Sequence, residues 1–314
     1  MGERYDGILY FLNKCSEKYS NEAIKQIDFN INDRGNENPS VKQYSMCFNK
    51  NIPNLEKFCG PDWCFYHWPS ANIHSFEEVK NEIIIESNKD PVIDKVGWFG
   101  NIYSPLPDVI EHKTRPLLKQ IGDDNIELFD IQHIAPICNI INNNIQNYMS
   151  LPDLIKYKYL IDIGGNGYSG RLKLLLFSKR PLILVDRNYI EYFQNDLIPY
   201  VHYIPVKIDL SDLLEQVNWI KNNYEKSIEI ANNAFIFATN NFTMDKLLNR
   251  VKYVYDNMSH NNQLLKQVNN QLLKQVDNQN QLAKQVDNQL LKQVDNQNIK
   301  IKLLILAKKN KLFN

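Results

Sequence analysis

The sequence predicts an α/β fold in which helices cover a parallel sheet. From Asp94 onward, short apolar runs alternate with stretches whose apolar residues recur at helical spacing, and this alternation is typical of βαβ units. A glycine-rich turn separates one strand-like run from the helical pattern after it, in "YLIDIGGNGYSGRLKLLLF" at 159–177. The chain has 314 residues and is 43% hydrophobic, which is enough to bury one large core or two smaller ones.

The predicted elements follow one another in a regular order. Short apolar runs indicate strands at 95–100, 126–131, 159–163, 181–186 and 201–206. Helical spacing indicates helices at 114–121, 172–177, 189–197 and 210–224. Because helices alternate with most of these strands, we expect the strands to run parallel.

The segment before this pattern differs in composition. Residues 1–90 mix short helical and strand-like patterns with many aromatic side chains, most densely in "GPDWCFYHWP" at 60–69. We therefore expect 1–90 to form one packed lobe and 91–258 to form a second lobe that carries the glycine turn.

After Met258 the chain becomes repetitive. Variants of "NQLLKQV" recur with Leu264, Leu272, Leu282 and Leu290 in equivalent positions, at steps of 8, 10 and 8 residues. One step of 8 and one of 10 complete five turns of a helix with 3.6 residues per turn, so the Leu/Val stripe returns to the same face. The repeat predicts a helical tail over 259–314, with homo-oligomers forming through 259–306. The alternative is an Asn/Gln-rich expansion without packed structure.

Charge and cysteine usage narrow the class of protein. The 36 basic and 36 acidic residues balance, so no nucleic-acid partner is expected. No window is long and apolar enough for a membrane span, and the N-terminus lacks the apolar segment of a signal peptide. The five cysteines are odd in number and have no C-x-x-C spacing, which favours reduced thiols over a zinc site. We expect a cytoplasmic protein without a metal site.

The glycine turn is the main candidate for a ligand site. Gly165, Gly167 and Gly170 fit G-x-G-x-x-G, and glycines let an anionic ligand approach the backbone and the first amides of the next helix. With Asp186 at the end of the next strand, the pattern suits a dinucleotide, and with Asp162 it equally suits S-adenosylmethionine. A nucleotide-sugar diphosphate is the third class. A tight turn that binds nothing also fits the pattern.

Longer phrases resemble a known family. "YKYLIDIGGNGYSGRLK", "PYVHYIPVKIDLSDL" and "EIANNAFIFA" occur in the order found in glycosyltransferase family 90, the group of capsule-associated xylosyltransferases and Rumi-like protein O-glucosyltransferases. "INDRGNENP" and "GPDWCFYHWPSANI" resemble two upstream segments of that family. The resemblance covers most of 28–242 and leaves the repetitive tail outside.

The resemblance implies a GT-B-like fold of two Rossmann-like lobes and an inverting transfer of xylose or glucose from a UDP-sugar to a hydroxyl group of a glycan or protein. The donor is a substrate, and no cofactor is implied. Arg171, directly after the last glycine, is expected to grip the diphosphate without a metal ion. The implied donor-binding residues are Ser104, Gly165, Gly167, Tyr168, Ser169, Arg171 and Glu191.

The catalytic base and the acceptor side are also carried over from the family. Asp33 matches its acidic position and is expected to take the proton from the acceptor hydroxyl, although "NDRG" is also a common turn sequence. Asp62 is the reserve candidate for the base. Trp63 and Trp68 are acceptor-side candidates, with packing in the interior as the alternative.

Two departures from the family leave other functions open. Phe99 stands where relatives usually carry a basic residue, and the segment before Asp33 is shorter than in the family. The alternatives are a methyltransferase or dinucleotide enzyme with the same glycine turn, and a non-catalytic oligomeric module derived from a transferase.

Overall fold

The computed structural model describes residues 2–103, 110–134 and 149–259, together with the isolated positions 271, 274, 275, 279 and 300. Ser104 and Cys138 lie outside the described residues, and so does nearly all of the predicted helical repeat at 259–314. The segment Met1–Met258 forms one compact unit.

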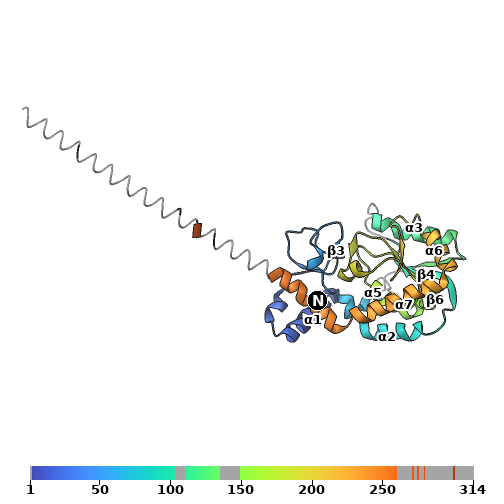
Figure 1. Ribbon diagram of the computed structural model, residues 1–314, viewed down its shortest axis with the longest axis horizontal. Helices are drawn as coiled ribbons and strands as arrows, with labels where there is room; N and C mark the ends of the chain where they lie inside the picture. The colour runs from blue at the N-terminus through green and yellow to red at the C-terminus, as the bar shows by residue number, and fades with distance from the viewer. Residues whose placement is uncertain are drawn as a thin grey trace, which may run out of the picture. The chain divides into compact units, whose positions relative to one another are not determined.

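A five-stranded parallel sheet lies at the centre of this unit (Figure 1). Its strand order is β5-β4-β6-β7-β9. The strands are β4 (Ile93–Gly100), β5 (Phe129–His133), β6 (Tyr157–Asp162), β7 (Leu182–Val185) and β9 (Ile204–Val206), and every pairing between them is parallel. The predicted α/β class is confirmed, and each predicted strand corresponds to one of these five.

Both faces of the sheet are buried. In β7, Ile183 and Val185 pack into one apolar cluster, whereas Leu182 and Leu184 pack into another, as the two-residue period of a strand requires. A strand buried on both faces reads as a continuous apolar run in the sequence, and "LILV" is such a run.

Helices cover the two faces as separate layers (Figure 1). One face packs against α3 (Ile110–Asp124) and α6 (Leu213–Asn222). The other packs against α2 (Phe76–Ser87), α5 (Leu172–Leu175) and α7 (Tyr224–Asn241). Hydrophobic burial on both sides of the sheet therefore holds the compact unit together.

The strand order reverses between β4 and β6. From β4 the chain passes to β5 on one side, and then returns to β6 on the other side of β4. In open parallel sheets, the helices on either side of such a reversal diverge and leave a crevice beyond the carboxyl ends of the two strands. The topology thus places the expected ligand site after Gly100 and after Asp162.

The chain before β4 contributes helices and very short strands. These are α1 (Glu3–Tyr19), η1 (Glu22–Gln26), β1 (Phe29–Asn30), β2 (Tyr44–Ser45), β3 (Phe48–Asn49), η2 (Glu56–Phe58), η3 (Trp63–Phe65) and η4 (Pro69–Ala71). β1 pairs with β2, and β3 pairs with β8 (Tyr189–Ile190) from the second half of the chain. The remaining elements are α4 (Leu151–Leu154), η6 (Tyr192–Asp196) and a helical segment at 244–259.

The core is continuous between the two halves of the compact unit. Ile8 and Phe11 of α1 share one apolar cluster with Leu160 of β6, Leu174 of α5 and Val251. Among the described residues, the only sheet of more than two strands is the central one. Residues 1–90 therefore pack directly against the layer that carries the glycine turn.

The predicted helix at 189–197 is wrong in its first part. Tyr189 and Ile190 form β8, which pairs antiparallel with Phe48 and Asn49, and the short helix η6 begins only at Tyr192. This pairing joins segments about 140 residues apart, and local periodicity carries no information about it.

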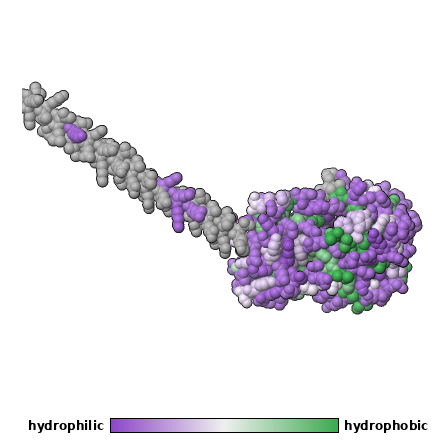
Figure 2. Space-filling view, viewed as in Figure 1, coloured by the Kyte–Doolittle hydropathy of each residue, from purple (hydrophilic) through white to green (hydrophobic). Residues whose placement is uncertain are grey.

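One face of the compact unit is largely polar. Hydrophilic residues dominate the face shown in Figure 2, with apolar side chains in separate patches. None of the helices in the described part of the chain has the length and hydropathy that a bilayer span requires.

Candidate functional site

A cavity of about 390 Å³ occupies the position predicted by the strand order. We call it the switch-point cavity. Its walls come from the carboxyl end of β4 at Phe99 and Gly100, from Arg115 of α3 and from the glycine turn at 164–171. The N-terminal part of the chain closes it with Arg4, Asp33, Trp63 and Trp68.

Most of the predicted site residues meet in this cavity. Its lining includes Asp33, Trp63, Trp68, Gly165, Tyr168, Ser169 and Arg171. Gly167, Asp62 and Glu191 do not line it. Segments more than 130 residues apart in the sequence are thus brought to one place, with the predicted base and the predicted phosphate-binding arginine on the same cavity.

Arg171 is fixed by contacts to two strands. Its Nη1 donates to the carbonyl of Phe99 over 2.8 Å, and its Nε donates to Oδ1 of Asp162 over 3.4 Å. The guanidinium also lies 5.2 Å from the ring centre of Trp98. A guanidinium held on two sides presents its remaining edge in a defined direction, which suits recognition of a planar or tetrahedral anion.

Asp162 is the anchor for Arg171. This carboxylate is fully buried and accepts hydrogen bonds from Ser169 Oγ and Arg187 Nη2, both over 2.7 Å. Burial by itself would raise the pKa of Asp162, but Arg187 and Arg171 outweigh burial and the pKa is lowered. The Ser169 hydroxyl is therefore engaged in holding Asp162 as well as lining the cavity.

The helix after the glycine turn is shorter than predicted. The expected helix at 172–177 is a single turn, α5, and Arg171 is its N-cap residue. A helix of one turn aligns only a few peptide dipoles, so its N-terminus contributes little positive charge to the cavity. The arginine side chains around the cavity must therefore supply most of its positive charge.

The glycines of the turn serve the packing of the chain. At Gly167, a Cβ atom would lie 1.9 Å from the carbonyl oxygen of Asp33, so the backbone of the Asp33 segment takes the space that a side chain would need. The Tyr168 amide donates to the same carbonyl over 3.4 Å. Gly164 has a φ of +73°, a conformation that favours glycine. The close approach at Gly167 thus docks Asp33 against the turn.

Asp33 lies at the cavity wall beside a cation. Its carboxylate is 2.7 Å from Arg4 Nη1 of α1, and its side chain is 27% exposed. The Arg4 guanidinium also donates to the Ile31 carbonyl and lies 5.8 Å from the ring centre of Trp63. A partly accessible carboxylate of this kind can accept a proton from a hydroxyl group bound in the cavity.

The two tryptophans form an aromatic wall. Trp63 and Trp68 meet edge to face with ring centres 5.4 Å apart, and Trp68 Nε1 donates to Ser70 Oγ. Trp63 is 3% exposed, so most of its surface packs in the interior. The rings thus pack in the interior and also line the cavity, and their contact with an acceptor stays a prediction.

Asp62 and Glu191 belong to a buried ionic cluster behind that wall. Lys173 Nζ lies 3.0 Å from Asp62 and 2.8 Å from Glu191, and all three side chains are essentially inaccessible. The same ammonium donates to the Gly170 carbonyl over 3.0 Å. Burial and the neighbouring Asp62 raise the pKa of Glu191 well above its ordinary value, although Lys173 opposes the shift. The cluster joins the glycine turn to the segments around Asp62 and Glu191.

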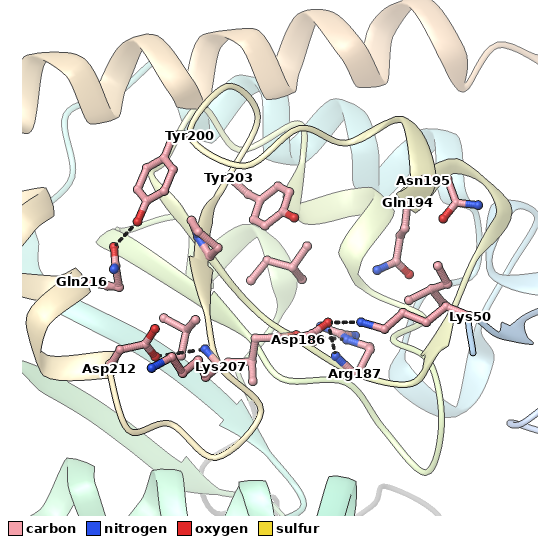
Figure 3. Close-up of a pocket in the computed structure, with 15 residues that line it drawn as sticks. Lys50, Asp186, Arg187, Gln194, Asn195, Tyr200, Tyr203, Lys207, Asp212 and Gln216 are labelled. Carbon is pink, nitrogen blue, oxygen red and sulfur yellow. Dashed lines mark hydrogen bonds and ion pairs between the residues drawn. The ribbon is translucent and has the colours of Figure 1, made fainter.

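A second cavity, of about 490 Å³, lies beyond the carboxyl ends of β7 and β9 (Figure 3). Asp186 pairs with Lys50 on one side of it, and Tyr200 donates to Gln216 over 3.1 Å on the other. The Tyr203 ring lies between these pairs. Apolar residues of the strand ends complete the lining, namely Leu184, Val185, Pro205 and Val206.

Arg187 connects the two cavities through Asp162. It lines the second cavity, while its guanidinium reaches Asp162, which holds Arg171 and Ser169 of the first. The sequence pointed to Asp162 only as a residue of an S-adenosylmethionine site, and it did not point to Arg115 or Arg187 as site residues. A signal for Arg187 was present, since it directly follows a predicted strand, and Asp162 lies near the end of another, at the edge of the sheet where ligands bind.

Comparison with known proteins covers both halves of this site. The family model described as Glycosyl transferase family 90 matches residues 27–306. Protein O-glucosyltransferase 2 of Danio rerio is 43% identical over 84 residues, which are 27% of this chain and 17% of that protein. Protein O-glucosyltransferase 1 of Rattus norvegicus is 39% identical over 97 residues, 31% of this chain and 25% of that protein.

Protein O-glucosyltransferase 3 of Homo sapiens is 37% identical over 90 residues, 29% of this chain and 18% of that protein. The aligned part thus spans a quarter or less of each of these relatives. The family model covers far more of the chain and includes Asp33, Arg115 and Arg171 of the switch-point cavity. On this match, the chain belongs to glycosyl transferase family 90.

Proposed function

We propose that this protein is an inverting glycosyltransferase that moves a sugar, with xylose or glucose favoured, from a UDP-sugar to a hydroxyl group of a glycan or protein. The observation that carries the proposal is that Asp33 and Arg171 line one cavity at the switch point of the sheet. An inverting transfer needs a carboxylate at the acceptor and a cation at the leaving diphosphate. Asp33 and Arg171 are groups of these two kinds.

In the proposed reaction, Asp33 takes the proton of the acceptor hydroxyl while that oxygen attacks the anomeric carbon. The bond between the anomeric carbon and the diphosphate oxygen breaks with inversion, and UDP leaves with the electron pair. Arg171 neutralises the charge that develops on the diphosphate, which a cation fixed in advance can do without reorganisation. Because a guanidinium supplies this charge, we propose that transfer is independent of metal ions and survives chelation by EDTA.

The second cavity suits the nucleoside of the donor. It lies over β7 and β9, next in the sheet to β4 and β6, and it combines the Tyr203 ring with the polar side chains of Gln194 and Asn195. Aromatic rings stack on bases, and amide groups can donate and accept hydrogen bonds at a base edge. We place the uridine there and the diphosphate near Arg171.

In the proposed GT-B-like arrangement, one side of the switch-point cavity binds the acceptor and the other side binds the donor. Residues 1–90 contribute Asp33, Trp63 and Trp68, the acceptor side, and 91–258 contribute the turn and Arg171, the donor side. Because the first part has only two-residue strands among its described residues, we propose that its lobe is a reduced one.

Thermal shift distinguishes this proposal from the other uses of a glycine turn. A ligand that binds only the folded state raises the melting temperature, so UDP is expected to raise it. S-adenosylmethionine and NAD are expected to leave it unchanged. Stabilisation by either of these, and not by UDP, would contradict the proposal.

Replacing Asp33 with asparagine is expected to lower turnover by roughly 10²-fold or more, because the amide cannot take the acceptor proton. The affinity for UDP, measured by calorimetry, is expected to stay near the parent value. The matched control is Asp28→Asn. Asp28 is an exposed carboxylate of the same segment; it accepts a hydrogen bond from Gln43 and does not line the cavity. Parent-like turnover of Asp33→Asn would exclude Asp33 as the base; Asp62, the reserve candidate, is buried against Lys173 and does not line the cavity.

A further inference from the structure

The first turn of α1 forms part of the wall of the switch-point cavity, through Arg4. The neighbouring Glu3 carboxylate accepts hydrogen bonds from the main-chain amide of Ser70 over 3.0 Å and from its hydroxyl over 2.6 Å. One turn further on, α1 packs closely on Trp63, since a Cβ atom at Gly7 would lie 2.6 Å from the Trp63 Cβ. The start of α1 is therefore fixed against the wall that carries the tryptophans.

Arg4 reaches from this turn to the segment that carries the proposed base. Its Nη1 lies 2.7 Å from Oδ1 of Asp33 and donates to the Ile31 carbonyl over 2.9 Å. The guanidinium also lies within cation–π distance of the Trp63 ring. A planar guanidinium with several contacts has few orientations open to it, so its position relative to Asp33 is well defined.

Asp33 is held at its main chain and at its side chain by different parts of the protein. Its carbonyl accepts hydrogen bonds from the Tyr168 amide over 3.4 Å and from Cys47 Sγ over 3.0 Å. These contacts fix the main chain but leave the side-chain torsions of Asp33 open. The ion pair with Arg4 supplies a restraint on the carboxylate itself.

The charge of Arg4 is engaged differently from that of the other arginines in the described lining. Burial by itself would lower the pKa of Arg4, but the Asp33 carboxylate outweighs burial and the pKa is raised. Arg4 is therefore a cation at neutral pH, paired with Asp33. Arg115 and Arg171 instead donate to carbonyl groups at the carboxyl ends of β4 and β6. Arg4 thus acts on the side of the cavity that holds the carboxylate.

We propose that Arg4 is a positioning residue for the transfer reaction, which holds the Asp33 carboxylate in the direction of the acceptor hydroxyl. Because Arg4 contacts Oδ1, we assign Oδ2 to the acceptor proton. A displacement of a reacting group by about 1 Å can lower a rate by roughly 10²-fold, so a restraint on this carboxylate matters for turnover. The inference rests on the proposed function, in which Asp33 is the base.

The experiment follows the release of UDP from UDP-xylose and UDP-glucose with water as the acceptor. Water attacks the anomeric carbon, its proton goes to Asp33, and UDP leaves with the electron pair. Arg4→Gln is expected to lower kcat roughly 10-fold to 100-fold. The KM for the donor and the affinity for UDP are expected to stay at the parent values, because Arg4 acts through Asp33. Arg4→Lys, which keeps the charge, is expected to recover part of the rate.

Lys14→Gln is the matched control for the loss of a cation from α1. Lys14 is exposed, pairs with Glu17 and does not line the cavity, so this variant is expected to turn over like the parent. Loss of turnover in Lys14→Gln equal to that in Arg4→Gln would overturn the inference, because the integrity of α1 would then be the property that matters.

A double-mutant cycle separates positioning from support of the fold. Adding Arg4→Gln to Asp33→Asn is expected to cause no further loss, since no charged base is left to position. An equal loss in both backgrounds would overturn the inference, and so would a parent-like kcat of Arg4→Gln beside a slow Asp33→Asn, which leaves the proposed function intact. A parent-like kcat of Asp33→Asn would instead contradict the base assigned in the proposed function, and the inference with it.

A measurement without turnover covers a protein that does not use water as the acceptor and an Arg4→Gln variant that does not fold. Phenylglyoxal modifies arginine side chains, and mass spectrometry locates the modified residues. Arg4 is expected to react faster in Asp33→Asn than in the parent, because its partner is lost. Arg250, which does not line the cavity, is expected to react at the parent rate. Unchanged reactivity of Arg4 would overturn the inference.

Discussion

Arg171→Ala is expected to reduce transfer by roughly 10²-fold to 10³-fold, which corresponds to about 2.7 to 4 kcal/mol of transition-state stabilisation. Arg171 holds its place through Phe99 and Asp162, so its charge is fixed before the diphosphate begins to leave. UDP binding is expected to weaken by about 1.5 to 3 kcal/mol, the usual value of a hydrogen bond to a charged group. Calorimetry with UDP and a transfer assay measure the two effects.

The fold is expected to survive this change. Asp162 keeps its hydrogen bonds from Arg187 and Ser169, so no buried carboxylate is left without a partner. Arg250→Ala is the matched control, because Arg250 also donates to main-chain carbonyls, those of Glu56 and Cys59, but does not line the cavity. UDP affinity unchanged in Arg171→Ala, or lost equally in Arg250→Ala, would remove Arg171 from the donor site.

Lys173→Met is expected to lower the free energy of unfolding by about 3 to 5 kcal/mol, the usual cost of removing one partner of a buried ion pair. The change leaves Asp62 and Glu191 buried without their cation and removes a donor from the Gly170 carbonyl. Urea denaturation followed by circular dichroism measures the loss. Lys158→Met is the matched control, since Lys158 pairs with the largely exposed Asp94 and is expected to cost less than about 1 kcal/mol.

The decrease in the free energy of unfolding caused by Lys173→Met is expected to depend on pH in a defined direction. Burial raises the pKa of Glu191, so the folded state binds this proton more tightly than the unfolded chain does. Stability from such a group is present at low pH and falls as pH rises above the unfolded value. Without Lys173, Glu191 loses the cation that opposes the rise of its pKa. The cost of Lys173→Met is therefore expected to be smaller near pH 4 than at pH 7. A cost independent of pH, or one below 1 kcal/mol, would contradict the role assigned to the cluster.

The sequence predicted the sheet well because its signal is local. Apolar runs such as "LILV" are buried on both faces, and such a strand reads as a continuous apolar run in the sequence. The helix predicted at 189–197 failed in part because Tyr189 and Ile190 are held by Phe48 and Asn49, which are distant in the chain. The oligomerising repeat at 259–306 and the role of Ser104 stay predictions, as Ser104 and nearly all of the repeat lie outside the described residues.

The sequence by itself determined the α/β class, the strand before the glycine turn and the residues through which the chain resembles its family. It did so because periodicity and motif spacing are properties of neighbouring residues. Only the tertiary structure decided that Asp33 docks on Gly167, that Asp162 is shared by Arg171 and Arg187, and that Arg115 holds Gly164. It also separated Asp33, on the cavity, from Asp62, which is buried against Lys173. These contacts join distant segments, and which carboxylate stays accessible depends on how the packed layers bury the others.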